Sequence, residues 1–312
     1  MQTVGCNYCG SDSFEELYRL PDLMLGKEKL TTLVRCRQCR LVYQNPRLTA
    51  LELEAHYPPD YESFQPPPPA EGGGASLLAR LRAYGQQKRV QIVAAEKAGG
   101  RLLDVGCASG AFLSALPPGW ERHGVETNQG AVEIGRRAGL NIFHGTLEAA
   151  NYPDYHFDAV TLWDVLEHLP DPAGSLAEIH RVLQPDGVVI IRVPNHASWE
   201  ARIFGRFWAG LDSPRHLFVF DIESLQKMLV KSGFSPGRRA GSVGLYPAFL
   251  LSIQFWMRGH PGRAARLQAV MKLLENPVTR LLAAPWFYGI GKTRWAAWVV
   301  LAASKHKADL EG

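Results

Sequence analysis

The chain has 312 residues, enough to bury one α/β core of about 200 residues with appended segments, or two modest domains. With 46% apolar residues, 21% charged residues and a net charge of +4, its composition is that of an ordinary globular protein. The sequence opens without a basic, apolar leader and contains no run of eighteen apolar residues, so we expect neither export nor a membrane span, and a cytoplasmic location. The positive charge is concentrated at one end: residues 238–312 carry 11 Lys or Arg against 3 Asp or Glu.

Four of the five cysteines form two pairs of the pattern C-x-x-C. Each pair brings two sulfur atoms onto one turn, and two such turns can close a tetrahedral Zn²⁺ site if the thiols stay reduced. A disulfide needs an oxidising compartment, for which nothing argues, and a thioredoxin-like redox site needs a single C-x-x-C. Since thiolates fill all four positions, the metal is expected to be structural. The predicted ligands are Cys6, Cys9, Cys36 and Cys39, in a zinc ribbon at 1–50 with short strands at 14–20, 31–36 and 41–45.

The rest of the chain divides into a tail and linker at 51–75 and a larger domain at 76–312. The linker reads QPPPPAEGGGA at 65–75, which suits neither helix nor strand. Beyond it, short apolar runs alternate with helical stretches, which predicts an α/β fold: a Rossmann-like, doubly wound sheet of seven strands. Strands are expected at 101–105, 121–126, 141–144, 157–163 and 187–193, within 237–245 and at 295–303, and helices at 76–98, 111–116, 129–138, 175–183 and 221–232.

The most informative segment is RLLDVGCASG at 101–110, in which a short apolar run leads into a turn of small residues and then a helix. Such a turn lets a ligand approach the backbone, and the helix start presents unpaired N–H groups to it. Asp104 at the strand end repels phosphate and suits an ammonium group, whereas Glu126 ends the next apolar run, where ribose hydroxyls are held. A ligand with an ammonium group and a ribose but no phosphate is S-adenosylmethionine. An ordinary strand, turn and helix is the alternative interpretation of the glycine-rich turn alone.

These two segments resemble motif I and the following acidic motif of class I S-adenosylmethionine-dependent methyltransferases. The resemblance continues in FDAVTLWDVLEHLPDP at 157–172 and GVVIIRVPN at 187–195, which are similar to small-molecule methyltransferases of the ubiquinone-biosynthesis type. It implies that the last strand is inserted antiparallel to the others. It also implies that the adenine lies near Thr146 and Leu147, and the methionine part of the cofactor near Asp164 and Val165. The predicted cofactor-binding residues are Asp104, Gly106, Cys107, Ala108, Gly110, Glu126, Thr127, Thr146, Leu147, Asp164 and Val165.

Two histidines are the candidates for acid–base chemistry, His168 and His216. Imidazole has a pKa near neutrality, which suits removal of a proton from an acceptor hydroxyl, and His216 is the first choice for the base. Under the alternative interpretations, Glu167 and His168 cap or flank a helix, and Arg215 and His216 orient a loop or cover the cofactor. Because the sulfonium is already activated and positioning supplies much of the rate, losing a base is expected only to slow the enzyme.

Between the sixth and seventh strands the chain is longer than the fold requires, with helical stretches at 246–259, 261–276 and 277–289. Pro261 and Pro277 suit first-turn positions. Amphipathic helices with basic and tryptophan-rich margins are typical of a membrane interface. A cap over the acceptor pocket and a dimer contact are the alternative interpretations of this insert, at about 246–290. Each implies a bulky or apolar acceptor, and the cationic excess favours anionic lipid or a lipid-linked phosphate.

The sequence therefore predicts an S-adenosylmethionine-dependent methyltransferase with structural Zn²⁺. The expected acceptor is the oxygen of a small-molecule, glycan or lipid-linked compound, with peripheral contact to the inner face of the membrane through 246–290 as one interpretation. The alternative is a zinc-ribbon RNA methyltransferase, but residues 1–65 carry 7 basic against 9 acidic side chains and WDVLEH lacks the pattern of base-methylating enzymes, so no nucleic-acid partner is expected. A cofactor-binding module without catalysis is a third interpretation. The oligomeric state and the acceptor itself are left open.

Overall fold

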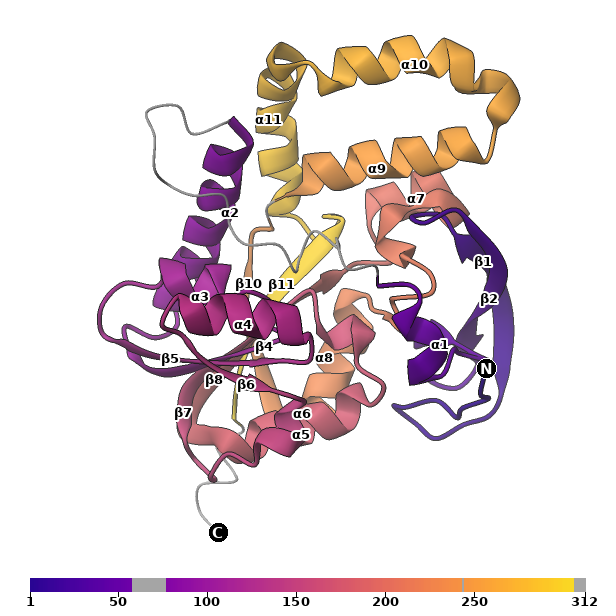
Figure 1. Cartoon of the computed structure of the whole chain (residues 1–312). Coiled ribbons are helices and arrows are strands. Elements are labelled where there is room, and N and C mark those ends of the chain that lie inside the picture. Colours follow the sequence, from indigo (N-terminus) through magenta and orange to yellow (C-terminus); the bar gives the residue numbers. More distant parts are fainter. Residues whose placement is uncertain (58–76, 243, 306–312) are drawn as a thin grey trace.

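The computed structural model describes residues 1–57, 77–242 and 244–305. Within them the chain forms a four-stranded and a seven-stranded sheet (Figure 1). The predicted linker at 65–75 lies outside the described residues, as does the part of the tail at 58–64.

The smaller sheet contains the N-terminal segment and one strand from far along the chain. Its order is β1-β2-β3-β9, and every pairing is antiparallel. The first three strands correspond to the predicted strands, although β2 begins earlier. The fourth was not predicted: its two residues pair with β3, Phe218 opposite Tyr43 and Val219 opposite Val42. The bounds are Phe14–Asp22 for β1, Lys27–Cys36 for β2, Val42–Gln44 for β3 and Phe218–Val219 for β9. The short helix α1, at Ala50–Glu54, follows β3 along the chain.

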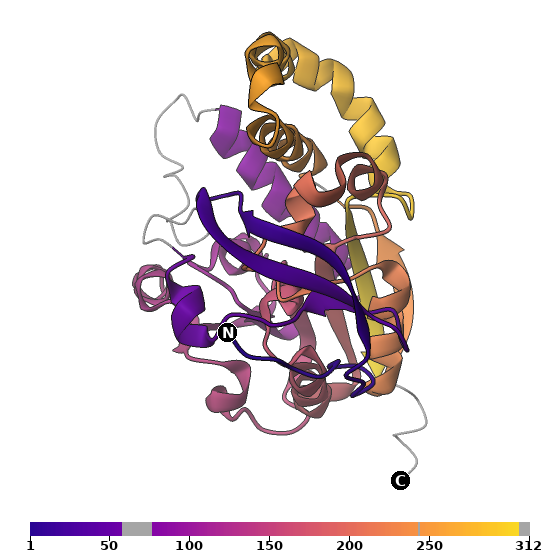
Figure 2. The same cartoon turned by 90° about the vertical axis from the view of Figure 1, so that its right-hand side faces the viewer.

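The larger sheet has the order β10-β11-β8-β7-β4-β5-β6, and helices cover both of its faces (Figures 1 and 2). Strand β11 runs antiparallel to both of its neighbours, β8 and β10, whereas the other pairings are parallel. This confirms the predicted α/β fold with seven strands and an inserted last strand. The bounds are Gly100–Val105 for β4, Trp120–Glu126 for β5, Asn141–His144 for β6, Phe157–Trp163 for β7, Leu183–Pro194 for β8, Phe234–Ala240 for β10 and Trp298–Lys305 for β11.

Strand β10 begins earlier than the sequence predicted. Gly233, with φ of +85°, ends the preceding helix, and the next side chain, Phe234, is already buried in the core. A left-handed glycine is a common way to stop a helix, and the aromatic side chain then anchors the strand. The predicted segment at 237–245 therefore overlaps only the second half of β10.

Six described helices of the larger domain, α4 to α8 and α11, begin at side-chain caps that the sequence supplies. Asn128 accepts from the Ala131 N–H, 2.9 Å away, and Asp221 and Ser224 form a capping box at the start of α8. Helix α5, helix α7 and the 3₁₀ turns were not predicted, because four to six residues carry little periodicity. The helices span Leu77–Ala94 for α2, Ala111–Ala115 for α3, Gln129–Arg137 for α4, Leu147–Ala150 for α5, Pro172–Val182 for α6, Trp199–Phe204 for α7 and Ile222–Lys231 for α8, with 3₁₀ turns at Leu166–His168, Gly205–Phe207 and Ala209–Leu211.

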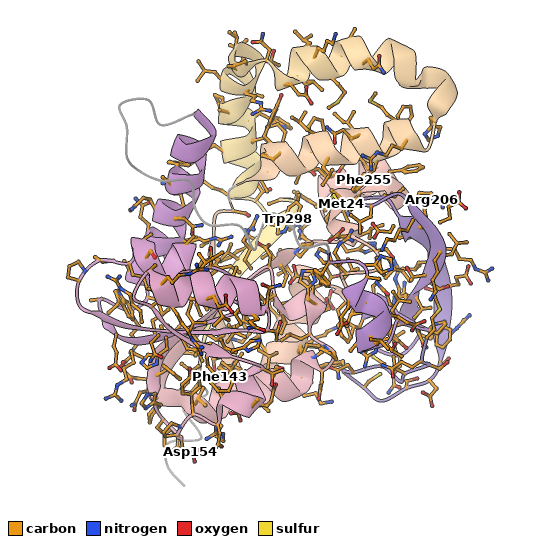
Figure 3. All side chains as sticks on the ribbon, in the orientation of Figure 1. Met24, Phe143, Asp154, Arg206, Phe255 and Trp298 are labelled. Atoms are coloured by element: carbon orange, nitrogen blue, oxygen red, sulfur yellow. The ribbon has the colours of Figure 1, made fainter. Side chains whose placement is uncertain are left out.

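The insert between β10 and β11 consists of three helices that rise beyond the sheet (Figures 1 and 2). They are α9 at Leu245–Arg258, α10 at Pro261–Glu275 and α11 at Pro277–Gly291, with proline in the first turn of α10 and of α11. Helix α9 packs against the rest of the molecule. Met24 of the N-terminal hairpin (β1 and β2), Arg206 of the 3₁₀ turn at Gly205–Phe207 and Phe255 of α9 line one small hollow and lie close together in Figure 3. Several apolar side chains of α10 and α11 are exposed.

Candidate cofactor and transfer site

The glycine-rich turn and the acidic residue of the next strand meet at the carboxyl edge of the larger sheet. Strands β4 and β5 are parallel neighbours, with Asp104 opposite Gly124 and Val105 opposite Val125. The turn is tied to β5 because Glu126 Oε2 accepts from the Ala108 N–H at 2.9 Å, while Oε1 accepts from the Asn128 N–H at 2.8 Å. Asp104 and Glu126 therefore lie on the same side of the domain, around one turn.

Asp104 is a buried carboxyl whose charge is weakly supported by the protein. It is 3% exposed and accepts a hydrogen bond from the Thr161 hydroxyl at 2.7 Å. Burial, aided by the negative charge of Glu126, raises the pKa of Asp104 to about 7, against the opposing effects of Thr161 and Arg89. A cationic ligand beside Asp104 would supply the missing positive charge.

The turn residues adopt conformations that need small side chains. Gly106 has φ of +69°, and a Cβ there would lie 2.6 Å from Val165 Cγ2. Gly110, with φ of +79°, is the residue before α3, and Ala108 is also left-handed at +48°. Cys107 is buried with its sulfur against Gly124, and burial raises the pKa of its thiol. Only backbone groups of Cys107 can therefore face a ligand in the turn.

Three further predicted cofactor-binding residues, Thr127, Thr146 and Leu147, follow the ends of β5 and β6; the adenine is expected near the last two. The Thr127 hydroxyl donates to Glu126 Oε1 at 3.4 Å. Thr146 precedes α5, and its hydroxyl oxygen caps that helix by accepting from the Ala149 N–H at 3.2 Å. The Leu147 side chain is buried. These positions are compatible with an adenine site, and adenine binding near Thr146 and Leu147 stays a prediction.

Two arginines that the sequence analysis did not single out neutralise Asp164. The residue follows β7 with φ of +61°, and its carboxylate pairs with Arg192 of β8 and, at 3.6 Å, with Arg89 of α2. Arg89 also lies 5.1 Å above the Trp163 ring. A lone arginine inside the apolar run of β8 was the available signal for Arg192, because a charge in a buried strand needs a partner. Asp164 therefore belongs to an ionic cluster at the carboxyl end of β7.

The two predicted catalytic histidines lie together, with ring centroids 4.6 Å apart. His216 is 7% exposed, and its Nδ1 bonds the carbonyl oxygen of Gly210 at 2.9 Å. His168 Nδ1 lies 3.0 Å from both the Tyr57 hydroxyl and the carbonyl oxygen of Arg215. Burial lowers the pKa of His216, and burial together with His216 lowers the pKa of His168 to about 3. Both rings are therefore neutral at pH 7, and the Nδ1 bond leaves His216 Nε2 able to accept a proton.

Glu167 shares this pocket with the two histidines. His216 Nε2 lies 3.9 Å from Glu167 Oε1, and neither carboxyl oxygen has a hydrogen-bond partner in the described part of the chain. Burial and the nearby charge of Asp164 raise the pKa of Glu167 well above its ordinary value. One ligand atom from each of Glu167, His168 and His216 lies within 4.8 Å of the others, so the group could hold a metal ion.

The four predicted metal ligands of the N-terminal segment also converge. The sulfurs of Cys6 and Cys39 are 3.4 Å apart, those of Cys9 and Cys36 are 3.5 Å apart, and all four lie within 4.8 Å of one another. A zinc–sulfur distance of about 2.3 Å places the sulfurs of a tetrahedral site about 3.8 Å apart, so the arrangement fits Zn²⁺. Burial acts to raise the pKa of Cys36, but hydrogen bonds from the N–H groups of Cys39 and Gln38 and from the Cys9 and Cys39 thiols outweigh it and lower the pKa to about 7.

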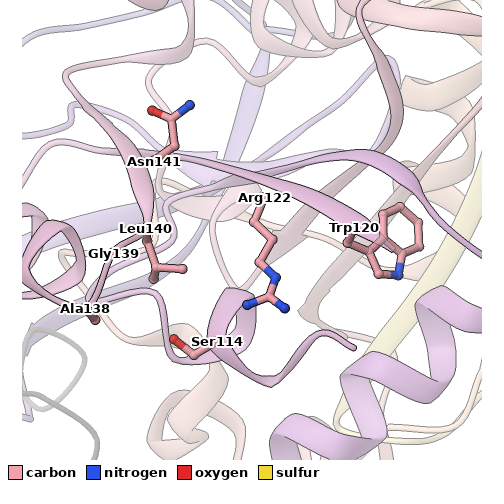
Figure 4. Close-up of a pocket in the computed structure, with 7 residues that line it drawn as sticks. All are labelled: Ser114, Trp120, Arg122, Ala138, Gly139, Leu140 and Asn141. Carbon is pink, nitrogen blue, oxygen red and sulfur yellow. The ribbon is translucent and has the colours of Figure 1, made fainter. Parts of the chain in front are cut away.

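A separate hollow opens at the amino ends of the strands. It is lined by residues at the amino ends of β5 and β6 and in the loops before them, including Trp120, Arg122 and Asn141 (Figure 4). Ligands of open α/β sheets bind at the carboxyl ends of the strands, so this hollow is not the cofactor site.

The comparisons with known proteins indicate one family. The model of the methyltransferase domain family matches residues 77–236, about half of the chain. Ubiquinone biosynthesis O-methyltransferase of Saccharophagus degradans is 30% identical over 211 residues, covering 65% of this chain and 77% of that protein. The enzyme of the same name from Thiobacillus denitrificans is 32% identical over 106 residues, 31% of this chain and 46% of that one. Demethylmenaquinone methyltransferase of Staphylococcus aureus is 30% identical over 113 residues, 33% of this chain and 47% of that one.

The chain thus spans about half the length of two of these three relatives and three quarters of the third. The family match begins at α2, so the four-cysteine segment lies outside it. The matched region contains Asp104, Glu126 and the histidine pair. From the fold, the glycine-rich turn and these matches, the chain belongs to the family of class I S-adenosylmethionine-dependent methyltransferases.

Proposed function

We propose that this protein transfers the methyl group of S-adenosylmethionine to an oxygen of a small-molecule acceptor of the quinone-precursor type or of a lipid-linked compound. The observation that carries the proposal is the pair of buried carboxyl groups, Asp104 and Glu126, around a turn of left-handed small residues. The relatives named ubiquinone biosynthesis O-methyltransferases support oxygen as the acceptor atom and a small molecule as the acceptor.

The residues of the site divide the work between binding and proton transfer. When bound, S-adenosylmethionine supplies a methyl group on a positively charged sulfur. Asp104 holds the cationic end of the cofactor, and Glu126, fixed by two backbone N–H groups, accepts from its ribose. His216 Nε2 removes the acceptor proton, because its Nδ1 is committed to the carbonyl oxygen of Gly210. His168 packs against His216 and fixes the orientation of its ring.

Calorimetry with S-adenosylhomocysteine tests the cofactor site without knowledge of the acceptor. Wild-type protein is expected to bind, and Glu126→Gln is expected to weaken binding at least tenfold by disturbing the ribose contact. Glu121→Gln is the matched control, since Glu121 is an exposed glutamate at the other end of the same strand. No detectable heat or thermal shift with wild-type protein at millimolar ligand would refute the proposal.

The four cysteines are assigned to a structural Zn²⁺. The support is the convergence of four sulfurs, which leaves no coordination position for a substrate. We expect one zinc per chain by metal analysis of the purified protein. Four thiols that react freely without metal release would contradict the assignment.

The insert is assigned to contact with anionic lipid on the cytoplasmic face of a membrane. No helix in the described residues is long and apolar enough to cross a bilayer. Helix α11, however, exposes Val278, Leu281, Leu282 and Trp286, which recur at helical spacing along one face. The stretch 245–294 contains seven Lys or Arg and one Glu, which complements a negative surface.

Cosedimentation with vesicles tests this assignment. We expect binding to vesicles of phosphatidylcholine and phosphatidylglycerol, weaker binding to phosphatidylcholine alone, and at least a tenfold loss in Leu281→Glu/Leu282→Glu. The control is Leu51→Glu, which changes an equally exposed leucine in α1. Equal partitioning with and without anionic lipid would contradict it.

A further inference from the structure

The four-cysteine segment makes several buried hydrogen bonds to the loop at 212–217, which carries His216. Strand β9, immediately after this loop, pairs with β3, so the loop is continuous with the N-terminal sheet. Figure 2 shows the N-terminal hairpin crossing in front of the larger domain. We propose that this segment positions the His168–His216 pair, through Gln44, Thr31 and Asp22, and that a metal at the four cysteines is required for that positioning.

Gln44 is the first of these positioning residues. Its side chain is fully buried, and its amide nitrogen donates to the carbonyl oxygens of Pro214 at 2.9 Å and His216 at 2.7 Å. Its backbone N–H donates to the carbonyl oxygen of Leu217 at 2.9 Å. Gln44 of β3 thus holds the backbone of the loop before, at and after His216.

A buried ionic network holds the same loop from β1. Arg215 is 1% exposed and binds both carboxylate oxygens of Asp22, at 2.9 and 3.1 Å. The same guanidinium binds Asp212 and donates to the carbonyl oxygen of His56 at 3.1 Å. Since desolvated charges need well-placed partners, Asp22 restricts where the residue next to His216 can lie.

Two hydroxyl groups complete the set of contacts. Thr31 of β2 bonds the Ser213 hydroxyl, at the start of the loop. Tyr57, which follows α1, bonds His168 Nδ1. Contacts from the N-terminal segment therefore reach His168 directly and reach His216 through its own backbone.

The predicted metal site lies at the turn that joins the strands making these contacts. Cys36 ends β2, and the turn from Cys36 to Cys39 leads into β3; the N–H of Cys36 bonds the carbonyl oxygen of Leu41 at 2.9 Å. Thr31 lies five residues before Cys36, and Gln44 lies five residues after Cys39. A metal that fixes this turn fixes the register of β2 against β3, and with it the positions of Thr31 and Gln44. The hydrogen bonds to Asp104 and Glu126, by contrast, come from Ala108, Thr127, Asn128 and Thr161, all within the larger domain.

The test uses the full, metal-loaded protein and does not need the acceptor. Gln44→Met keeps the size of the side chain and removes both amide donations, and Thr31→Val removes one hydroxyl without a change of shape. Gln129→Met is the matched control, because Gln129 is a glutamine on the surface of α4. The readouts are the imidazole ¹⁵N resonances of the ten histidines, assigned with His168→Gln and His216→Gln, amide hydrogen exchange by peptide, and S-adenosylhomocysteine affinity.

In Gln44→Met we expect the resonances of His168 and His216 to move while those of the other histidines stay. Exchange in 212–217 should rise at least tenfold, exchange in 101–110 should stay within twofold, and S-adenosylhomocysteine affinity should stay within twofold. Thr31→Val should change the same signals to a smaller extent and serves as the test if Gln44→Met does not fold. Removing the metal from wild-type protein with a chelator should reproduce the Gln44→Met pattern.

The inference rests on the proposed function for the meaning of the histidine pair, but the two fail in different ways. If wild-type protein does not bind S-adenosylhomocysteine, the proposed function is wrong. If it binds, yet the two histidine resonances do not respond to Gln44→Met, Thr31→Val and metal removal, the positioning inference is wrong. Parallel loss of cofactor affinity in these samples would also overturn it, since it would show general loosening of the fold.

Discussion

Replacement of Glu200 by glutamine is expected to make the protein more stable at alkaline pH. Glu200 lies in α7, its side chain is fully buried, and neither carboxyl oxygen has a hydrogen-bond partner in the described part of the chain. Burial raises its pKa from an ordinary value of 4.5 to about 8. The folded state therefore holds the proton of Glu200 at pH values where the unfolded chain has lost it.

The sign and size of the effect follow from this difference. A pKa raised in the folded state contributes stability that is present below pH 4.5 and is lost as the pH rises through 8. The loss relative to low pH is about 1 kcal/mol at pH 5, about 3 kcal/mol at pH 7 and about 5 kcal/mol at pH 9. Glutamine has the same shape and does not ionise, so Glu200→Gln should gain about 4 kcal/mol over the wild type between pH 5 and pH 9.

Urea unfolding followed by tryptophan fluorescence at pH 5 and pH 9 measures this gain. Taking the difference between the two pH values cancels any effect of the substitution that does not depend on pH. Glu223→Gln is the control, because the Glu223 side chain is 75% exposed and its pair with Lys227 is worth little. If Glu200→Gln and the wild type lose stability in parallel between pH 5 and pH 9, the carboxyl is not a desolvated, unpaired group and the reasoning is wrong.

Two further predictions concern the cofactor site and the buried ionic network. The pKa of Asp104 is about 7, and the ammonium group of S-adenosylhomocysteine favours the ionised carboxylate, so binding at pH 6 should release close to one proton and affinity should rise from pH 5 to pH 7. Calorimetry in two buffers of different ionisation enthalpy measures the proton release, and a release that persists in Asp104→Asn would contradict the prediction. Asp22→Asn should destabilise the protein by about 2–4 kcal/mol, because it removes a charge partner from the buried Arg215. The control Asp12→Asn, at an exposed aspartate, should change stability by less than about 0.5 kcal/mol, and equal unfolding midpoints of the two variants in urea would refute this prediction.

The placement of the predicted cofactor-binding residues could be foreseen because its signals are local. Asp104 and the glycines of the turn are within seven residues of each other, and their conformations depend on backbone sterics that the residue types themselves impose. Glu126 ends the adjacent strand, which the alternation of strands and helices already placed at the same edge. The grouping of the four cysteines could be predicted equally well, since the spacing within each pair determines that two sulfurs share a turn.

The surroundings of His168 and His216 could not be predicted in the same way, because their contacts join segments that are distant in the sequence. His216 could be named from its chemistry, but the sequence does not show that Gln44 holds its backbone or that Arg215 is paired with Asp22, 193 positions away. The pairing of β3 with β9 involves two residues, too few to produce a periodic signal. Likewise, the two arginines at Asp164 come from α2 and β8.

The sequence by itself determined the elements with local causes: the seven strands of the larger sheet, the glycine-rich turn, the cysteine pairs and the helical insert. Tertiary structure alone decided that the N-terminal segment and the larger domain share a sheet, and that their buried charges neutralise one another. The physical reason is that backbone conformation and side-chain periodicity act over a few residues, whereas a buried charge or an unpaired strand edge is satisfied by whichever group the fold brings within hydrogen-bond distance.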